Sequence, residues 1–319
     1  MLKFVSRKIT LQWFLLFGLI GVAIYTVLAK THLTEQAGNA FLFNNFRIFF
    51  SKNELIGKGV ILIILLLQIV LLQFYFRKNE YSAKNNLLPA CFYLSILLIT
   101  KSLIYISPFF FTLLFFLIII SINYTGNAIA IKNNALWVGM LIAFATCFDV
   151  SSIVLLVLAM ITLVINHFFK MKEIAILIFG FLLVYFYFFS YHFFVNHLDE
   201  WLLTFQQIKV LGVFDPKILT HTTTLFTLIT LSICYFYFVV RTKIINDSKI
   251  VIQRKRIITL NTRALLMIAC LFISNSPYPD VLGYLFIHLS IYLTLLAQEK
   301  SPLYINEFVT VVTFLVLCL

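Results

Sequence analysis

The residues in this sequence that could do chemistry are a few charged side chains set in or beside apolar runs. Asp149 lies in the stretch FATCFDVSS, Lys101 in KSLIYIS, and Asp280 directly after SPYP. A charge within a membrane is costly, so an ionisable residue in such a place is a candidate site residue. Lys101 could bind an anion. Each residue also has a structural alternative, because the aspartates could cap the helices that follow them and Lys101 could extend to the membrane surface.

Two further candidates lie in the loop that follows the first apolar run. Glu35 lies where that run ends and could equally be a plain surface acid, whereas Arg47 lies in the phenylalanine-rich stretch GNAFLFNNFRIFF. His197, Asp199 and Glu200 look like a metal cluster, but the polar face of an amphipathic helix explains their spacing better. The sequence contains no nucleotide-binding loop, zinc motif, nucleophile elbow or dinucleotide fingerprint. It therefore predicts neither a metal nor a cofactor.

Membrane helices are expected to carry these residues. Hydrophobic residues make up 62% of the chain, charged residues make up 11%, and the mean hydropathy is +1.03. No soluble domain of ordinary size has this composition. We therefore predict an all-α, polytopic membrane protein that forms one integral membrane domain over residues 1–319. About eleven transmembrane segments are expected, at 11–29, 57–76, 87–100, 108–122, 135–147, 152–169, 174–193, 222–240, 264–275, 281–297 and 306–319.

The distribution of basic residues predicts the orientation of these segments. If the N-terminus is cytoplasmic, 17 of the 24 Lys and Arg residues fall in the gaps on the cytoplasmic side. That bias is the positive-inside rule of polytopic membrane proteins. This bias explains the formal net charge of +12 as a topology signal, so the charge does not require a nucleic-acid partner. A multi-pass protein of a bacterial inner (cytoplasmic) membrane is the expectation.

Two features of the segment pattern could build a site on the exterior side. The outward segments at 87–100, 135–147 and 264–275 have fewer apolar residues than the roughly 20 that a spanning helix needs. Their turns could therefore lie below the membrane surface and bring Lys101, Asp149 and Asp280 to one recess. The long exterior loops at 30–56 and 194–221 have apolar residues at helical spacing, and each predicts an amphipathic helix in the interface.

The order of these features resembles the GT-C superfamily of polytopic membrane glycosyltransferases, of the protein mannosyltransferase and aminoarabinose transferase type. The stretches that carry the resemblance are TEQAGNAFLFNNFRIFF, LLITKSLIYISPFFFTLLFFL and ALWVGMLIAFATCFDVSSIVLLVLA. They also look like those of an uncharacterised bacterial membrane-protein family. The resemblance makes 11–240 the core, followed by a basic cytoplasmic loop at 241–263 and C-terminal helices at 264–319.

The resemblance also assigns roles to the candidate residues. It implies that Glu35, with Asp149, forms the catalytic pair, and that Glu35 is the base that deprotonates an acceptor hydroxyl. It also implies that Arg47 or Lys101 contacts the phosphate of a polyprenyl-phosphate sugar that enters from the membrane lipid. Asp280 would belong to the same substrate-binding recess. The superfamily's paired acid motif is reduced here to Thr34-Glu35, and Asp149 replaces the basic residue expected in the fifth-to-sixth turn.

Three functions remain open from the sequence. The first is a glycosyltransferase for cell-envelope glycosylation. The second is a non-catalytic membrane subunit or assembly factor that acts with other membrane subunits, and the third is a lipid or solute transporter. A glycosyltransferase predicts that the carboxylates gather beside a cation in an exterior cleft. A scaffold predicts scattered residues, and a transporter predicts a polar path that reaches both faces.

Overall fold

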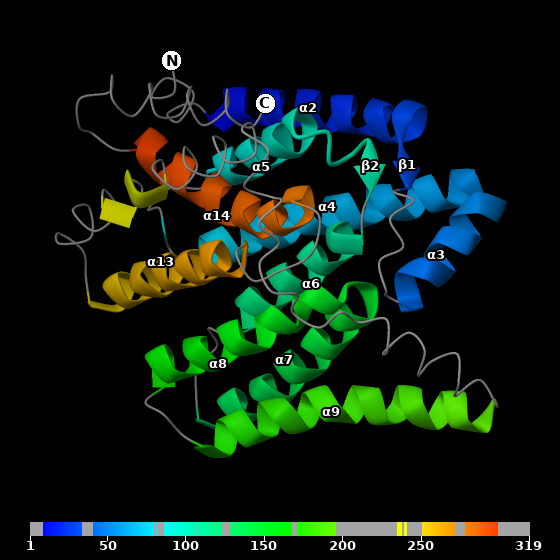
Figure 1. The fold of residues 1–319 in the computed structure, drawn as a ribbon. Helices are drawn as coiled ribbons and strands as arrows, with labels where there is room; N and C mark the ends of the chain where they lie inside the picture. Colours follow the sequence, from blue (N-terminus) through cyan, green and yellow to red (C-terminus); the bar gives the residue numbers. More distant parts are fainter. Residues whose placement is uncertain are drawn as a thin grey trace, which may run out of the picture.

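The fold is described by a computed structural model that covers residues 9–33, 41–79, 81, 86–106, 108–122, 128–167, 171–195, 235–237, 239–240, 251–271 and 278–298. Helices dominate this part of the chain, which confirms the predicted all-α class (Figure 1). The elements are α2 (Ile9–Lys30), β1 (His32–Leu33), α3 (Phe41–Lys52), α4 (Glu54–Lys78), α5 (Leu88–Ile99), β2 (Tyr105–Ile106), α6 (Pro108–Ile122), α7 (Ala128–Phe148), the 3-10 turn η1 (Val150–Ile153), α8 (Val154–His167), α9 (Met171–Phe194), α13 (Val251–Leu271) and α14 (Tyr278–Gln298).

Three of the described helices are long and apolar enough to cross a membrane. α2, α4 and α9 have 22, 25 and 24 residues, which at 1.5 Å per residue gives lengths of about 33–38 Å. A hydrocarbon core is about 30 Å thick, so each can span it. Large apolar side chains point outward from them, including Phe14 and Phe194, which are both 82% exposed. Such a surface is stable against lipid and unstable against water.

Of the outward segments expected to be short, only α5 is a short helix. It has 12 residues, whereas α7 and α13 have 21 each, so the prediction of three short helices was wrong for those two. α7 begins at Ala128 and continues through Asn133 and Asn134 before it reaches the predicted segment 135–147. α13 includes residues 251–263, for which the sequence predicts a cytoplasmic loop. Hydropathy marks the apolar part of a helix, but helical geometry continues through polar residues.

Contacts between helix ends show which of them lie together at each of the two ends of the bundle. The strands β1 and β2 pair in parallel and lie at the same end as α3 (Figure 1). We call this the β-bridge end, and it contains the last turns of α2, α5 and α7 and the first turns of α4 and α6. At the opposite end, Lys78 and Arg256 bond to carbonyl oxygens at the ends of α6 and α4. Among the described residues, those of these helix ends that are predicted to share a side of the membrane lie at the same end.

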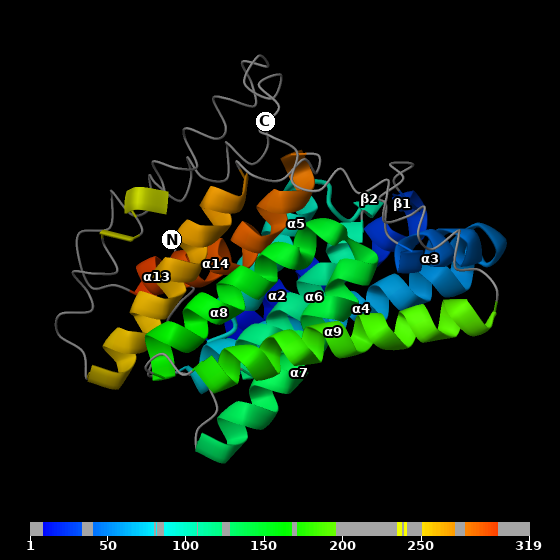
Figure 2. The same ribbon diagram turned by 60° about the horizontal axis from the view of Figure 1, so that its bottom comes forward.

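The helices α7 and α9 pack unusually closely. A Cβ atom added at Gly139 would lie 2.9 Å from Phe181 N and 3.0 Å from Leu177 C. One added at Gly180 would lie 3.2 Å from Leu136 C. Two glycines in reciprocal contact thus let the two backbones approach, as small residues do at helix interfaces in membranes. Figure 2 shows α9 lying along α7 at the edge of the bundle.

Candidate functional site

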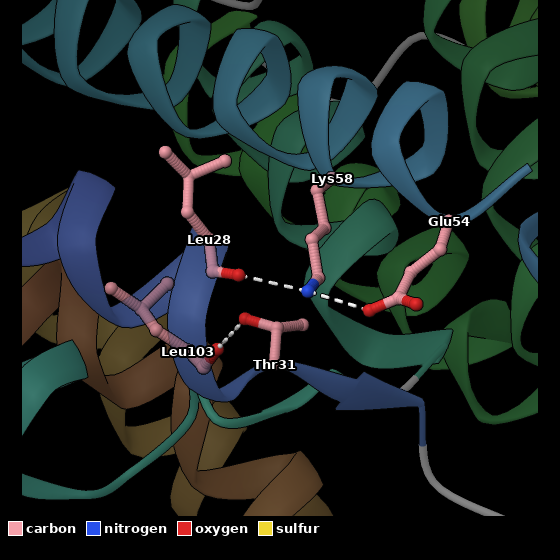
Figure 3. Close-up of polar contacts among 5 residues, drawn as sticks. All are labelled: Leu28, Thr31, Glu54, Lys58 and Leu103. Atoms are coloured by element: carbon pink, nitrogen blue, oxygen red, sulfur yellow. Dashed lines mark hydrogen bonds and ion pairs between the residues drawn. The ribbon is translucent and has the colours of Figure 1, made fainter.

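The last turn of α2 is hydrogen-bonded to α4 at the β-bridge end (Figure 3). Lys58 Nζ donates a hydrogen bond of 2.8 Å to Leu28 O and forms an ion pair of 2.6 Å with Glu54. The last carbonyl groups of a helix have no partner within it, and a cation at this point also interacts favourably with the helix dipole. Thr31 Oγ1 then donates to Leu103 O at 2.7 Å. These contacts join α2, α4 and the α5–α6 connection.

The chain leaves α2 as the strand β1 and pairs with β2 in the α5–α6 connection. His32 lies opposite Tyr105, Leu33 lies opposite Ile106, and His32 N donates to the adjoining Ile104 O at 2.8 Å. β1 ends two residues before Glu35, which lies outside the described residues. The pairing therefore brings the chain that leads to the predicted base beside the connection that contains Lys101.

Lys101 ends α5 in a backbone conformation that is normally taken by glycine. Its φ is 56°, the one positive value among the non-glycine residues that the structure describes. Ser102 N donates to Leu97 O and Lys101 N to Leu98 O, both at 3.2 Å, which is the Schellman pattern of helix ends. A side chain in this left-handed conformation costs about 1–2 kcal/mol. The lysine side chain is exposed.

Asp149 occupies the single-residue join between α7 and η1. Its amide donates to Ala145 O at 2.9 Å, and its carbonyl accepts from Ser152 N at 3.0 Å. The residue is half-buried. The preceding Phe148 stacks on Phe111 of α6, with ring centroids 5.1 Å apart. The expectation of a tight turn at Asp149 is confirmed, and the turn is packed on protein.

The amphipathic helix predicted for residues 41–50 is present as α3. Its aromatic side chains pack on neighbouring helices to an extent that periodicity did not reveal. Phe43 is fully buried, and the ring centroid of Phe46 lies 4.8 Å from that of Phe111. Phe49 remains 40% exposed and Arg47 is half-buried. Arg47 therefore belongs to a helix that is anchored on α6 at the β-bridge end.

The N-terminal half of α14 also reaches the β-bridge end. Tyr284 OH donates to Thr112 Oγ1 of α6 at 2.9 Å and lies 3.0 Å from Ser152 Oγ of η1. Asp280 is the third residue of α14, so the expectation that it precedes a helix starting at residue 281 was wrong. The proline at position 279 fits the first turn of a helix, where no backbone N–H is required.

The structure therefore brings Arg47, Lys101 and Asp149, together with the backbone of Asp280, to one end of the bundle. Glu35, His197, Asp199 and Glu200, and the second predicted amphipathic loop, lie outside the described residues. Sequence reasoning missed the contacts of Lys58. The spacing of Glu54 and Lys58, four residues apart at a helix start, was the signal that could have shown the pair.

Chemically, the described part of this end offers the exposed Lys101, the half-buried Arg47 and the half-buried Asp149, in addition to the ion pair of Lys58 and Glu54. Such a set suits the recognition of an anionic group, because both Lys and Arg bind phosphate oxygens. In the part of the chain that the structure describes, no three His, Cys, Asp or Glu residues are grouped to hold a metal ion. No protein-family model, no curated protein and no solved structure matches the chain.

Proposed function

We propose that this protein is a membrane glycosyltransferase of the GT-C type that acts at the β-bridge end. It takes the sugar from a polyprenyl-phosphate donor and transfers it to a component of the cell envelope. In this proposal the N-terminus is cytoplasmic, the protein lies in a bacterial inner membrane, and the β-bridge end faces the exterior. Glu35 is the base, and Lys101 and Arg47 bind the donor phosphate.

The conformation of Lys101 is the observation that best supports the proposal. Glycine would adopt the left-handed conformation at this position at lower free energy, since it has no Cβ to strain. A lysine that is held there against this cost presents a charge at the connection that pairs with the chain leading to Glu35. Strained residues of this kind cluster at functional sites. An exposed cation at this place suits a phosphate that arrives from the membrane.

The arrangement at Lys58 favours a second candidate, a non-catalytic membrane subunit. Both partners of its side chain, Leu28 O and Glu54, serve to join α2 to α4. Thr31 likewise serves to hold α2 against the α5–α6 connection. A scaffold needs such ties between helices and needs no base at Glu35. The enzyme proposal requires the carboxylates of Glu35 and Asp149 to take part in the transfer, whereas the subunit proposal does not.

The test compares envelope glycans, measured by mass spectrometry, in a strain that lacks the gene and in strains complemented with variants. We expect the deletion to remove a glycan, the wild-type gene to restore it, and Glu35→Gln not to restore it. Loss of a general base typically lowers the rate by on the order of a hundredfold or more. Asp149→Asn should also reduce transfer. Membrane abundance of each variant is measured in parallel.

If the deletion leaves all glycans unchanged, the enzyme proposal is wrong and the subunit becomes the better explanation. If the deletion removes a glycan but both carboxylate variants restore it, the protein is needed for glycosylation and the residue roles are wrong.

A further inference from the structure

One face of α4 is apolar and exposed over almost the full length of the helix. Successive residues of an α-helix are rotated by about 100°, and the large exposed apolar residues of α4 fall within an arc of about 120°. The buried residues of α4 lie outside this arc. The residues of the exposed arc are Leu55, Ile56, Ile63, Leu66, Leu67, Val70 and Phe74. We call this face the α4 stripe.

The length of the α4 stripe matches the apolar thickness of a membrane. Leu55 and Phe74 are 19 positions apart, which at 1.5 Å per residue gives about 29 Å, and a hydrocarbon core is about 30 Å thick. Charged residues follow directly beyond both ends, because Glu54 is 64% exposed and Arg77 is exposed. A contact with another protein gives no reason for this length or for these charges, so the stripe fits lipid.

The exposed apolar surface continues from the α4 stripe onto α3. Ile48 and Phe49, in the last turns of α3, are 54% and 40% exposed, and Leu55 and Ile56, in the first turn of α4, are 78% and 58% exposed. We call these four residues the α3–α4 corner. It lies at the edge of the bundle, where α3 meets the start of α4 (Figure 2). The sequence places Leu55 and Ile56 in an exterior loop, whereas the structure places them on the face of a helix of spanning length.

The angle between the two helices is set by packing. Asn53 N donates to Phe49 O and Gly57 N donates to Asn53 O, both at 2.9 Å, so backbone hydrogen bonds continue through the corner. A Cβ atom added at Gly57 would overlap the ring of Phe50, which is 8% exposed. The absence of a side chain at Gly57 thus lets this ring lie against the α4 backbone. The exposed residues on the two helices are therefore held together as one surface.

We propose that the α3–α4 corner is a lipid-binding surface that enters the membrane leaflet at the β-bridge end. The hydrocarbon boundary lies between Glu54 and Leu55, and α3 lies along this boundary. The apolar face of such a helix is buried about 5–10 Å into the region between headgroups and acyl chains. The exposed Lys52 extends to the phosphates, as long basic side chains do at a membrane surface. The β-bridge end then lies at headgroup depth, whether or not the protein is a transferase.

The experiment measures tryptophan fluorescence of the full chain in vesicles of phosphatidylcholine that carries bromine either near the glycerol or near the end of the acyl chain. Bromine quenches a tryptophan that it contacts. Single tryptophans are introduced as Phe49→Trp, Leu55→Trp or Leu66→Trp. The background replaces the three native tryptophans by phenylalanine: Trp13, Trp137 and Trp201.

The two tryptophans of the corner should lose more fluorescence with bromine near the glycerol than with bromine near the chain end. Leu66 is 11 positions after Leu55 and therefore about 16 Å deeper, close to the middle of the membrane. Leu66→Trp should show the opposite order of quenching. Phe49 and Leu55 are on different helices and both are exposed, so each variant tests the surface even if the other does not fold.

The matched control is Ser51→Trp, because Ser51 is an exposed polar residue on the flank of α3. It should lose less fluorescence to either lipid than Phe49→Trp and more to acrylamide in the water. Equal quenching of these two variants by lipid would contradict a directed apolar face. Tryptophans at 49 and 55 that acrylamide quenches and lipid does not would place the corner in water and overturn the proposal. Quenching by neither would also overturn it, because a second copy of the chain or another protein would then cover the corner.

Discussion

Replacing Gly139 by alanine should force α7 and α9 apart. The atom nearest to the added Cβ would be the carbonyl oxygen of Leu177, and Phe181 N would lie 2.9 Å away, while ordinary contact begins at 3.4 Å. The backbones must therefore separate by more than the roughly 0.5 Å that the contact with Phe181 N alone requires. The neighbouring atoms are backbone and cannot rotate away. Overpacking of this kind costs about 1–3 kcal/mol. For a chain of 319 residues, with an entropy of unfolding of about 2 cal/mol/K per residue, that is a decrease in melting temperature of roughly 2–5 °C.

The assay is a thermal melt of detergent-solubilised protein, followed by size-exclusion chromatography of the fraction that remains folded. Gly180→Ala should lower the melting temperature similarly. The decrease in melting temperature of the double variant should be smaller than the sum of the two single decreases, because the first alanine already separates the helices. Gly21→Ala on α2 is the control, since a Cβ there meets nothing described within 4 Å and alanine favours a helix. A neutral Gly139→Ala would refute the close packing of α7 and α9.

Two other predictions concern the β-bridge end and the orientation. Lys58→Met should destabilise the protein by about 1 kcal/mol, because it removes both the Leu28 O contact and the ion pair with Glu54. A thermal melt should show a smaller loss for Glu54→Gln, since Glu54 is 64% exposed, and equal losses would contradict this assignment. In a cysteine-free background in intact cells, Ser51→Cys should react with an impermeant thiol reagent and Lys172→Cys should not, and the reverse pattern would contradict the proposed orientation.

The sequence predicted the class of the fold and several elements well, since these depend on local patterns. The spacing of the phenylalanines at 41–50 predicts α3. The concentration of basic residues in every second gap between apolar runs predicts which helix ends lie together. The sequence failed where tertiary contacts decide. Arg263 is only 1% exposed and lies within α13, where a hydropathy pattern places a loop. The hydroxyl groups of Thr162 and Tyr75, on α8 and α4, accept its hydrogen bonds, and no local signal predicts them.

The candidate site was predictable only in part, for a similar reason. Turns beside apolar runs identify Lys101 and Asp149 as residues at helix ends. The pairing of β1 with β2 joins residues more than 70 positions apart, and no periodicity in one sequence encodes that contact. The left-handed conformation of Lys101 was also hidden, because the sequence has lysine where glycine is the usual signal.

The most direct test of the proposed site is Lys101→Gly, with stability and transfer measured on the same variant. Glycine removes the left-handed cost, so the melting temperature should rise by about 2 °C, from a gain of about 1 kcal/mol. The deletion strain complemented with this variant should still lack the glycan, because the cation for the donor phosphate is gone. Lys101→Arg should keep both transfer and wild-type stability. A Lys101→Gly protein that is more stable and restores the glycan fully would contradict the account, and so would one that melts earlier.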